Sequence, residues 1–487
     1  MKLAVITDLH FSRQDNVQLP DRVGHFADIF LLKAIQRLNR YIKPDLLFIG
    51  GDLINDANDD DAITMLEELK QLINLIECPV IIIPGNHDPA PDLFYQIFER
   101  PLAAVDINGV RFLPFIDEEQ PGYNAIRSQS DLAKMRQLAQ AFNGPVVSLQ
   151  HVPLFKQGTT ASPANYTNSA EIISIMRDNG ITLAVSGHYH TGYDIIDYEG
   201  IQSVTVPACC EAPFCFMEID IDHAGRAITT THKLSLPDNL PPLTDYHIHT
   251  HLAYCGENMD MLKTLQIAQL TGLNRVSFSE HAGQLYLSNE DYWSSAYFAK
   301  GLAGCNLENR MNDFLTALKA TSGNFLSGLE LDTDINGNFT AFQADVDQVD
   351  VKIGALHALH IDDFDDYDAV KKEFMYRTEQ IVKNNVDILA HPFRMFRRCN
   401  LPTAPELYEP VAKLLKATNT AAEINLHTND PDPEFLLCCI NHGVKLSFGS
   451  DSHNLYEVGE LHQHLTIMDS IGYLNRLDEV LLNIIPK

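Results

Sequence analysis

Residues 84–88 read Pro-Gly-Asn-His-Asp and follow directly on the apolar run Val80–Ile83. A hydrophobic run that stops at a glycine-containing turn predicts a buried strand. Its end then presents an amide oxygen, an imidazole and a carboxylate. Open α/β sheets form their sites just outside the carboxyl ends of strands. Taken alone, Asn-His-Asp is equally typical of an Asx turn after a strand.

The rest of the first half repeats this arrangement, because four other apolar runs also end in residues that bind metals. They are followed by Asp8-Leu9-His10, by Gly51-Asp52, by His151 and by Gly187-His188-Tyr189-His190. Two divalent cations about 3.5–4 Å apart can clamp a phosphoryl group and activate a water between them. Such a pair needs a bridging carboxylate with oxygen and nitrogen ligands on each side. Asp52, alone at its strand end, is the natural bridge.

The spacing of apolar residues predicts alternating strands and helices. Residues 26–42 have helical spacing, Leu46–Ile49 is a short buried strand, and Met65–Ile76 is a second helix. This order predicts parallel strands with right-handed crossovers. Further strands are predicted at Val110–Ile116, Val146–Leu149, Leu183–Val185, Ile201–Val206, Phe214–Ile221 and Ala227–His232. The last three lie close together and predict an antiparallel meander in a second sheet.

In this order, the five motifs resemble the calcineurin-like metallophosphoesterases across about residues 1–235, and within them the class III cyclic-nucleotide phosphodiesterases. The resemblance implies a four-layer α/β/β/α sandwich over residues 1–236. It also implies a role for His87, which would protonate the leaving oxygen or steady the transition state without binding metal. The implied ligands are Asp8, His10, Asp52 and His190 for one metal, and Asp52, Asn86, His151 and His188 for the other.

A proline-rich segment divides the chain. Residues 237–242 hold three prolines and predict a stiff, extended linker. Residues 243–487 then alternate strands and helices, and the strand ends again carry candidate ligands. Those residues are His247 and His249, His281, Glu330, His357, His391, Glu423, and Asp451 with His453. The pattern predicts a β/α barrel with its site on the C-terminal face.

The second half resembles the PHP (polymerase and histidinol phosphatase) family, most closely its histidinol-phosphatase-like members. The resemblance implies a distorted (β/α)7 barrel. The implied ligands are His247, His249, Glu330 and Asp451 for one metal, Glu330, His357 and His391 for a second, and His281 with His453 for a third. The remaining ligand of the third metal is Glu257 or, as the alternative, Cys255, because the segment 251–257 departs from the family pattern. Glu423 matches the family, either as a ligand or as a partner that orients other ligands.

Arg394, Arg397 and Arg398 form a basic cluster just after His391. Arginine suits bidentate recognition of phosphate, which makes Arg394 and Arg397 candidate substrate-binding residues. A solvated helix face explains the same cluster.

Composition limits the classes of protein and partner. A formal net charge of -30 repels long polyanions, so we expect no long nucleic acid as partner. Nine cysteines without CxxC spacing are typical of reduced thiols in a cytoplasmic protein. The chain has neither a signal peptide nor an apolar stretch of the ~20 residues that a membrane helix needs, so we expect no membrane partner. The sequence leaves the oligomeric state open.

The patterns together predict a bifunctional metal-dependent phosphoesterase that acts on small phosphoesters. The first domain would hydrolyse phosphodiesters and the second phosphomonoesters, with two divalent metals in the first centre and two or three in the second. Oxygen and nitrogen ligands suit Mn, Fe or Zn. The rival hypotheses are a nuclease acting on short oligonucleotides, and a protein in which one decayed centre has a binding or regulatory role.

Overall fold

The computed structural model describes residues 1–198 and 200–486 and divides into two compact units, Met1–Ser235 and Leu236–Lys487. Each unit has its own sheets and its own hydrophobic core. Within the described residues, no helix is both long enough and apolar enough to cross a membrane.

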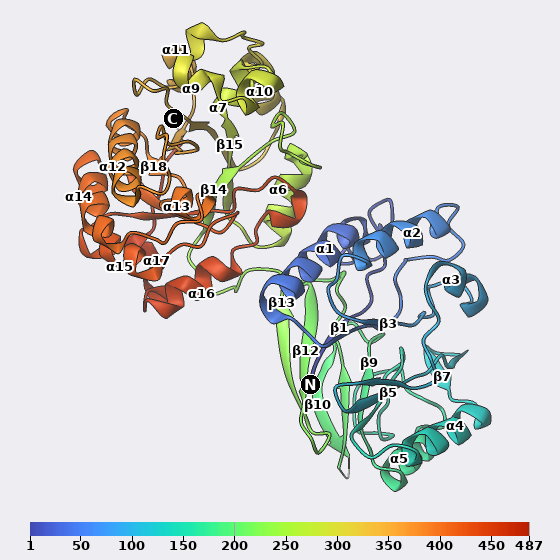
Figure 1. The fold of residues 1–487 in the computed structure, drawn as a ribbon. Coiled ribbons are helices and arrows are strands. Elements are labelled where there is room, and N and C mark those ends of the chain that lie inside the picture. Colours follow the sequence, from blue (N-terminus) through green and yellow to red (C-terminus); the bar gives the residue numbers. More distant parts are fainter. Residues whose placement is uncertain (199, 487) are drawn as a thin grey trace. The chain divides into compact units, whose positions relative to one another are not determined.

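The first unit contains two sheets that pack face to face, with helices on the outer side of each (Figure 1). The five-stranded sheet runs β13 (Ala227–Lys233), β12 (Cys215–Ile221), β1 (Lys2–Ile6), β2 (Leu46–Ile49), β3 (Val80–Ile82). The six-stranded sheet runs β10 (Tyr193–Tyr198), β11 (Ile201–Thr205), β9 (Ile181–Ser186), β8 (Val146–Leu149), β5 (Val110–Pro114), β4 (Val105–Ile107). A separate hairpin joins β6 (Glu118–Gln120) to β7 (Asn124–Ile126).

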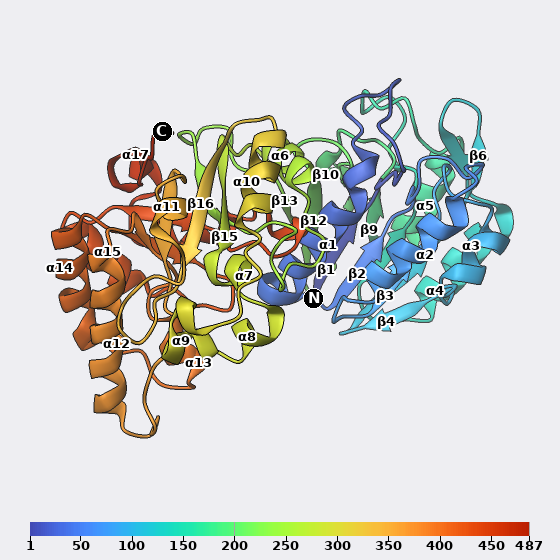
Figure 2. The same ribbon diagram turned by 90° about the horizontal axis from the view of Figure 1, so that it is seen from above.

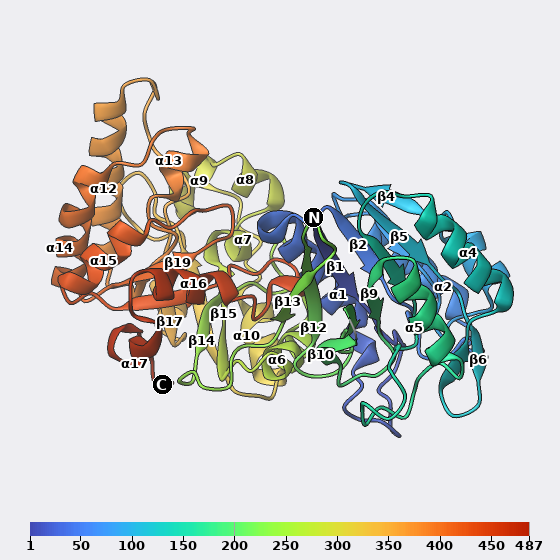
Figure 3. The same ribbon diagram turned by 90° about the horizontal axis from the view of Figure 1, so that it is seen from below.

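The helices of this unit form its two outer layers. They are η1 (Gly24–Phe26), α1 (Ala27–Arg37), the π-helical turn η2 (Leu38–Ile42), α2 (Ala62–Ile73), α3 (Pro91–Ile97), α4 (Gln129–Gln140) and α5 (Ser169–Asp178). Buried aliphatic side chains such as Val5 and Phe48 of one sheet pack against Val147 and Val185 of the other. Helices α4 and α5 lie side by side on the six-stranded sheet (Figure 3). The predicted four-layer sandwich is therefore confirmed.

The predicted meander is wrong in one respect. Strands β12 and β13 pair with each other, but β12 also pairs antiparallel with β1 (Lys2↔Asp220), so both strands belong to the first sheet. Strand β11 instead pairs parallel with β9 in the second sheet. The connection between β11 and β12 passes from one sheet to the other, where the N–H groups of Cys209 and Cys210 donate to the carbonyls of Thr7 and Asp8. Closeness along the chain did not reveal that change of sheet.

The second unit is a closed barrel of seven parallel strands, as predicted. The strands are β14 (Thr244–Ile248), β15 (Arg275–His281), β16 (Phe325–Leu331), β17 (Val351–Gly354), β18 (Ile388–Leu389), β19 (Ala421–Asn425) and β20 (Leu446–Gly449). Pairing of Asp245 with Phe448 closes the ring. Tyr246, Leu326 and Ile353 are among the side chains of its core.

Helices surround the barrel, with α12, α14 and α15 on the outer side of the strands (Figure 2). The longer helices are α6 (Met261–Leu270), α10 (Met311–Ala320), α12 (Tyr367–Lys383), α14 (Tyr408–Thr418), α15 (Pro433–Asn441) and α16 (His462–Ser470). The short ones are α7 (Ala282–Tyr286), α8 (Asn289–Trp293), α9 (Ala296–Lys300), η3 (Leu302–Gly304), α11 (Gln343–Val346), α13 (Arg394–Arg398), η4 (Pro405–Leu407), η5 (Leu455–Glu457), η6 (Leu474–Arg476) and α17 (Leu477–Val480).

Candidate metal centres

In the first unit, the strand ends bring the predicted ligands into one cluster. Asp8 and His10 follow β1, Asp52 follows β2, and His188 follows β9. All four have left-handed backbone angles, with φ of 55°, 46°, 53° and 66°. Such conformations cost of order 1–3 kcal/mol each in a non-glycine residue and concentrate at functional sites. The chain therefore maintains strain at the residues that the sequence marks as ligands.

Asp52 lies between the two halves of this cluster. Its Oδ2 is 3.5 Å from His10 Nε2 and 3.4 Å from His151 Nε2. On one side, His10 Nε2 is 3.1 Å from His190 Nε2. On the other, His151 Nε2 is 3.1 Å from Asn86 Oδ1. Ligands at right angles on one ion, each at ~2.1 Å, stand about 3 Å apart, so these separations fit two ions that share Asp52.

Two further observations fit a cation here. Asp8 Oδ1 is buried and has no hydrogen-bond partner among the described residues, which is costly for a carboxylate without a bound ion. Burial, reinforced by the neighbouring His151, lowers the pKa of His188 to about 4. The His188 ring is therefore neutral near pH 7, and a ligating imidazole must be neutral.

Hydrogen bonds orient the histidine rings of this centre. His151 Nδ1 lies 2.7 Å from the carbonyl oxygen of Gly50, and His188 Nε2 lies 3.1 Å from that of Tyr123. His190 Nδ1 lies 2.6 Å from Glu211 Oε1. Each contact fixes the proton on one nitrogen and leaves the other nitrogen facing the cluster, as metal ligands require.

His87 lies at the edge of this centre. Its Nδ1 is 2.7 Å from the carbonyl oxygen of Asn55, and its backbone N–H donates to Asp52 Oδ1 at 2.9 Å. Its ring meets that of His10 edge to face, with centroids 4.7 Å apart. Because Nδ1 carries the proton donated to Asn55, Nε2 is the nitrogen left to exchange a proton with a bound molecule. His87 also groups with His10 and Asp52 at ligand distances.

Asp88 holds the turn in place without joining the cluster. Its carboxylate accepts from the backbone N–H groups of Leu53, Ile54 and Gly85. Burial, together with the nearby charge of Asp52, raises the pKa of Asp88 to about 7.

In the barrel, Glu330 occupies the centre of the second cluster and is 1 % exposed. Its Oε1 is 3.3 Å from His357 Nε2 and 3.1 Å from His391 Nε2. The same oxygen is 3.6 Å from His247 Nε2. Asp451 Oδ1 lies on the same side of Glu330 as His247, at 2.9 Å from His249 Nε2. Glu330 therefore lies between the two predicted ligand sets.

The barrel cluster also fits cations. His247 Nε2 is buried and lacks a hydrogen-bond partner among the described residues. Burial and the neighbouring His249 lower the pKa of His453 to about 2, so this ring is neutral. Left uncompensated, these groups would be expensive to bury.

A third group forms beside Glu330. His281 Nδ1 contacts Glu330 Oε2, and His281 Nε2 lies 3.4 Å from His453 Nε2. His249, rather than Glu257, joins these two within ligand distances. Glu257 is exposed and accepts from Asn454 Nδ2 at 2.7 Å, whereas Cys255 Sγ accepts from Gln284 Nε2 at 3.3 Å.

Several carboxylates that the sequence analysis did not single out orient the barrel histidines. Asp332 Oδ1 is 2.7 Å from His357 Nδ1, and Glu280 Oε1 is 3.3 Å from His249 Nδ1. Glu423, one of the candidates from sequence, lies 2.8 Å from His247 Nδ1 and so has the orienting position. The positions of the other two offered a signal, because Asp332 stands two residues after Glu330 and Glu280 directly precedes His281.

The sequence analysis also missed two other residues near the clusters. Cys210 Sγ lies within ligand distance of His10 and His190, although the sequence suggested only a reduced thiol. His427 stacks on His453 with ring centroids 4.7 Å apart.

The structure does not bring the two candidate substrate-binding arginines together. Arg394 is buried and donates to Asp451 Oδ2 at 3.0 Å. Arg397 is exposed and lines a cavity with Asn429 and Phe435, whose lining also includes Glu423. Arg398 is exposed and interacts electrostatically with Asp451 and Glu330.

Comparisons with known proteins agree with this architecture. Residues 1–192 match the calcineurin-like phosphoesterase family, and residues 245–427 match the PHP domain. The first unit is similar to the 3',5'-cyclic adenosine monophosphate phosphodiesterase CpdA of Haemophilus influenzae, with 26% identity over 43% of this chain and 77% of that protein. It is also similar to the glycerophosphodiester phosphodiesterase GpdQ of Enterobacter lignolyticus, with 25% identity over 44% of this chain and 80% of that protein.

Among solved structures, the histidinol phosphate phosphatase of Lactococcus lactis aligns with 47% of this chain and 94% of its own, at 17% identity and a TM-score of 0.35.

The fold and the two clusters define a metal-dependent phosphoester hydrolase. Within that class, the chain joins a calcineurin-like phosphoesterase domain to a PHP domain.

Proposed function

We propose that the chain is a bifunctional phosphoesterase whose first centre hydrolyses a small phosphodiester and whose second hydrolyses the resulting phosphomonoester. The observation that supports this proposal is the presence of two clusters of candidate metal ligands. Each has one buried carboxylate in the bridging position, Asp52 in the first and Glu330 in the second.

The residues of the first cluster would hold two divalent ions, and those of the second two or three, with Mn, Fe and Zn all suited to such ligands. Bound ions of this kind lower the pKa of water and polarise phosphoryl oxygens. The chain supplies the remaining chemistry of the first centre through His87, which donates a proton from Nε2 to the leaving oxygen. This step uses the doubly protonated imidazolium ring; once Nε2 has given up its proton, the hydrogen bond from Nδ1 to the Asn55 carbonyl holds the neutral ring in its Nδ1–H form.

Two considerations support a diester as the first substrate. The relatives of the first unit are named as cyclic-nucleotide and glycerophosphodiester phosphodiesterases. An alkoxide leaving from a diester also needs a proton, which the position of His87 suits. In the barrel, Arg398, which interacts electrostatically with Asp451 and Glu330, would provide the positive charge that a phosphomonoester dianion needs.

Covalent linkage of the two centres raises the effective concentration of the first product at the second centre. The test is to supply an unactivated diester, such as a nucleoside cyclic phosphate or a glycerophosphodiester, to the intact chain and to Glu330→Gln. The intact chain should release orthophosphate, and the variant should stop at the monoester. If the intact chain accumulates the monoester and does not hydrolyse it further, sequential action is wrong.

A further inference from the structure

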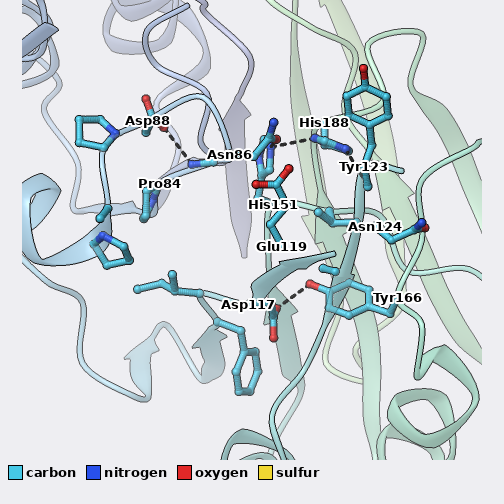
Figure 4. A pocket seen from close by; sticks show the side chains of 18 residues that line it. Pro84, Asn86, Asp88, Asp117, Glu119, Tyr123, Asn124, His151, Tyr166 and His188 are labelled. Atoms are coloured by element: carbon cyan, nitrogen blue, oxygen red, sulfur yellow. Dashed lines mark hydrogen bonds between the residues drawn. The ribbon is translucent and has the colours of Figure 1, made fainter. Parts of the chain in front are cut away.

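A cavity of about 200 Å3 adjoins the first centre (Figure 4). Its inner end is formed by Asn86, His151 and His188, on the side of the second metal position. One wall is the segment 84–91, and the other is the β6–β7 hairpin with the end of β5. The carbonyl of Tyr123, in the turn of that hairpin, accepts from His188 Nε2. The hairpin is therefore attached to the metal centre.

One acidic residue of the cavity is already neutralised. Asp117 binds Arg127 through two contacts, Oδ1 to Nε at 3.0 Å and Oδ2 to Nη2 at 2.9 Å. Tyr166 donates its hydroxyl to the same carboxylate at 2.6 Å. This satisfied network forms a rigid, uncharged part of the wall.

Glu119 differs, because it has no ion pair or side-chain hydrogen bond among the described residues. Figure 4 shows its side chain directed from the hairpin toward the end of the cavity where Asn86 and His151 lie. No lysine or arginine lines this cavity in the part of the chain that the structure describes. A molecule bound in this cavity therefore meets the Glu119 carboxylate without a neighbouring lysine or arginine in the described lining. The ring of Tyr123, which also lines the cavity, offers a face that can contact a cation.

The position of His87 indicates which part of a diester enters this cavity. His87 lies against His10, on the side of the first metal position, and is not among the described residues that line the cavity. The leaving oxygen must lie near His87 if that residue protonates it. The cavity then receives the substituent that stays on phosphorus. Its volume is below the ~300–1,000 Å3 of typical ligand pockets, so that substituent is small.

We propose that Glu119 determines the specificity of the first centre: its carboxylate favours diesters whose retained substituent is small and positively charged, and disfavours any further negative charge. This inference rests on the diesterase function proposed above. It also gives a reason for the division of labour between the two centres, since a phosphomonoester dianion carries the extra negative charge that Glu119 repels. The first centre would release the monoester and not consume it.

The experiment uses three diesters with the same para-nitrophenolate leaving group and a retained aminoethyl, propyl or carboxyethyl group. Nitrophenolate release by the intact chain gives kcat/KM for each. The wild type should prefer the aminoethyl ester and react most slowly with the carboxyethyl ester. In Glu119→Gln, the ratio between these two should fall roughly tenfold, because attraction and repulsion each contribute up to about fivefold at an exposed site. The change should lie in KM, since Glu119 does not touch the reacting atoms.

Glu118→Gln is the matched control, because Glu118 is the adjacent exposed carboxylate of the same strand but does not line the cavity. It should keep the wild-type ratio, whereas Glu119→Lys should invert the order of the charged esters. In a chain that also carries Glu330→Gln, the Glu119→Gln substitution should raise hydrolysis of para-nitrophenyl phosphate by roughly fivefold.

Equal discrimination by wild type and Glu119→Gln would overturn the inference and leave the diesterase function standing. Loss of bound metal from Glu119→Gln, measured by elemental analysis, would also overturn it, because Glu119 would then be part of the metal centre. If the metal-loaded wild type hydrolysed none of the three diesters, the proposed diesterase function would itself be wrong.

Discussion

Both centres combine buried carboxylates with histidines, but several of those histidines are oriented by different kinds of group. In the first unit, backbone carbonyls of Gly50 and Tyr123 orient His151 and His188, and ligands at the rim are partly exposed beside a cavity. In the barrel, side-chain carboxylates such as Glu423 and Asp332 orient the histidines. The ligands His247, His249, Glu330 and Asp451 are at most 1 % exposed.

The difference has an electrostatic consequence. A carboxylate that hydrogen-bonds to a ligating histidine raises the basicity of that histidine. When both groups are buried, removal of one of them leaves the other without a partner, which costs stability. A backbone carbonyl orients the ring without adding charge. We therefore expect the barrel centre to depend more strongly on its surrounding side chains than the first centre does.

The largest effects are expected from the two bridging carboxylates, which test whether the centres are independent. Asp52→Asn should lower hydrolysis of bis(para-nitrophenyl) phosphate by at least about 100-fold. Loss of a residue that hydrogen-bonds to a metal ligand typically costs about 10–100-fold in metal affinity or activity, and loss of a carboxylate shared by two metals should cost more. Hydrolysis of para-nitrophenyl phosphate by the barrel should persist. Glu330→Gln should have the reverse effects, so each variant controls for the other. Loss of both activities in either folded variant would contradict independent centres.

The next largest effect concerns His87, and it tests whether proton donation distinguishes the first centre. His87→Ala should keep its metals but slow hydrolysis of alkyl diesters by ~10²–10⁴-fold, the usual contribution of general acid catalysis. Diesters with a nitrophenolate leaving group should be slowed least, because that group departs without a proton. Metal content and rates across a series of leaving groups give the measurement. An equal loss for every leaving group would remove His87 from this role.

Much of the fold was predictable, because apolar runs that end in polar ligands mark parallel strands with little ambiguity. The seven barrel strands and the order β1, β2, β3 followed from that pattern. The pairing of β12 with β1 did not, since it is a long-range contact between Lys2 and Asp220 that no local pattern encodes. The β6–β7 hairpin was also missed, because its strands are only three residues long and bury only Ala125.

The candidate metal ligands were also easier to predict from the sequence than the residues that orient them. Most of the residues predicted as metal ligands could be named from the sequence because they stand at or near the carboxyl ends of apolar runs, and the structure brings them close together in each unit. Asp332 and Glu280 were missed because their role depends on which nitrogen of a histidine they face, and that depends on packing. Arg394 and Arg397 belong to one basic cluster in the sequence, but Arg394 is buried against Asp451 and Arg397 is exposed, a difference that charge alone does not encode.

A smaller effect is expected from the carboxylates that orient histidines. It tests directly whether the barrel centre depends more strongly on its surrounding side chains than the first centre does. Glu423→Gln should lower the metal affinity of the barrel by about 10–100-fold, because a buried partner of His247 is lost. Glu211→Gln, the equivalent change behind His190, should cost less, because Glu211 is about one-third exposed (32%) and water can replace it. Competition with a metal chelator measures both affinities. A larger loss from Glu211→Gln would mean that burial does not set the sensitivity of these centres.

The smallest effect is expected at Glu257, the residue chosen from sequence for the third barrel metal. Its carboxylate is exposed and binds Asn454, whereas His249, His281 and His453 already form a group at ligand distances. Glu257→Gln should therefore leave the metal content of the chain unchanged. Cys255 is half-buried and interacts electrostatically with Glu280 and Asp451. Cys255→Ser should weaken binding of the most loosely held ion by up to about tenfold, the lower end of the range for a supporting residue. Metal content at graded chelator concentrations measures both variants. If Glu257→Gln released an ion and Cys255→Ser did not, Glu257 would be the ligand of the third metal, as the sequence analysis chose. The loop 251–257 would then have to place Glu257 differently when metal is bound.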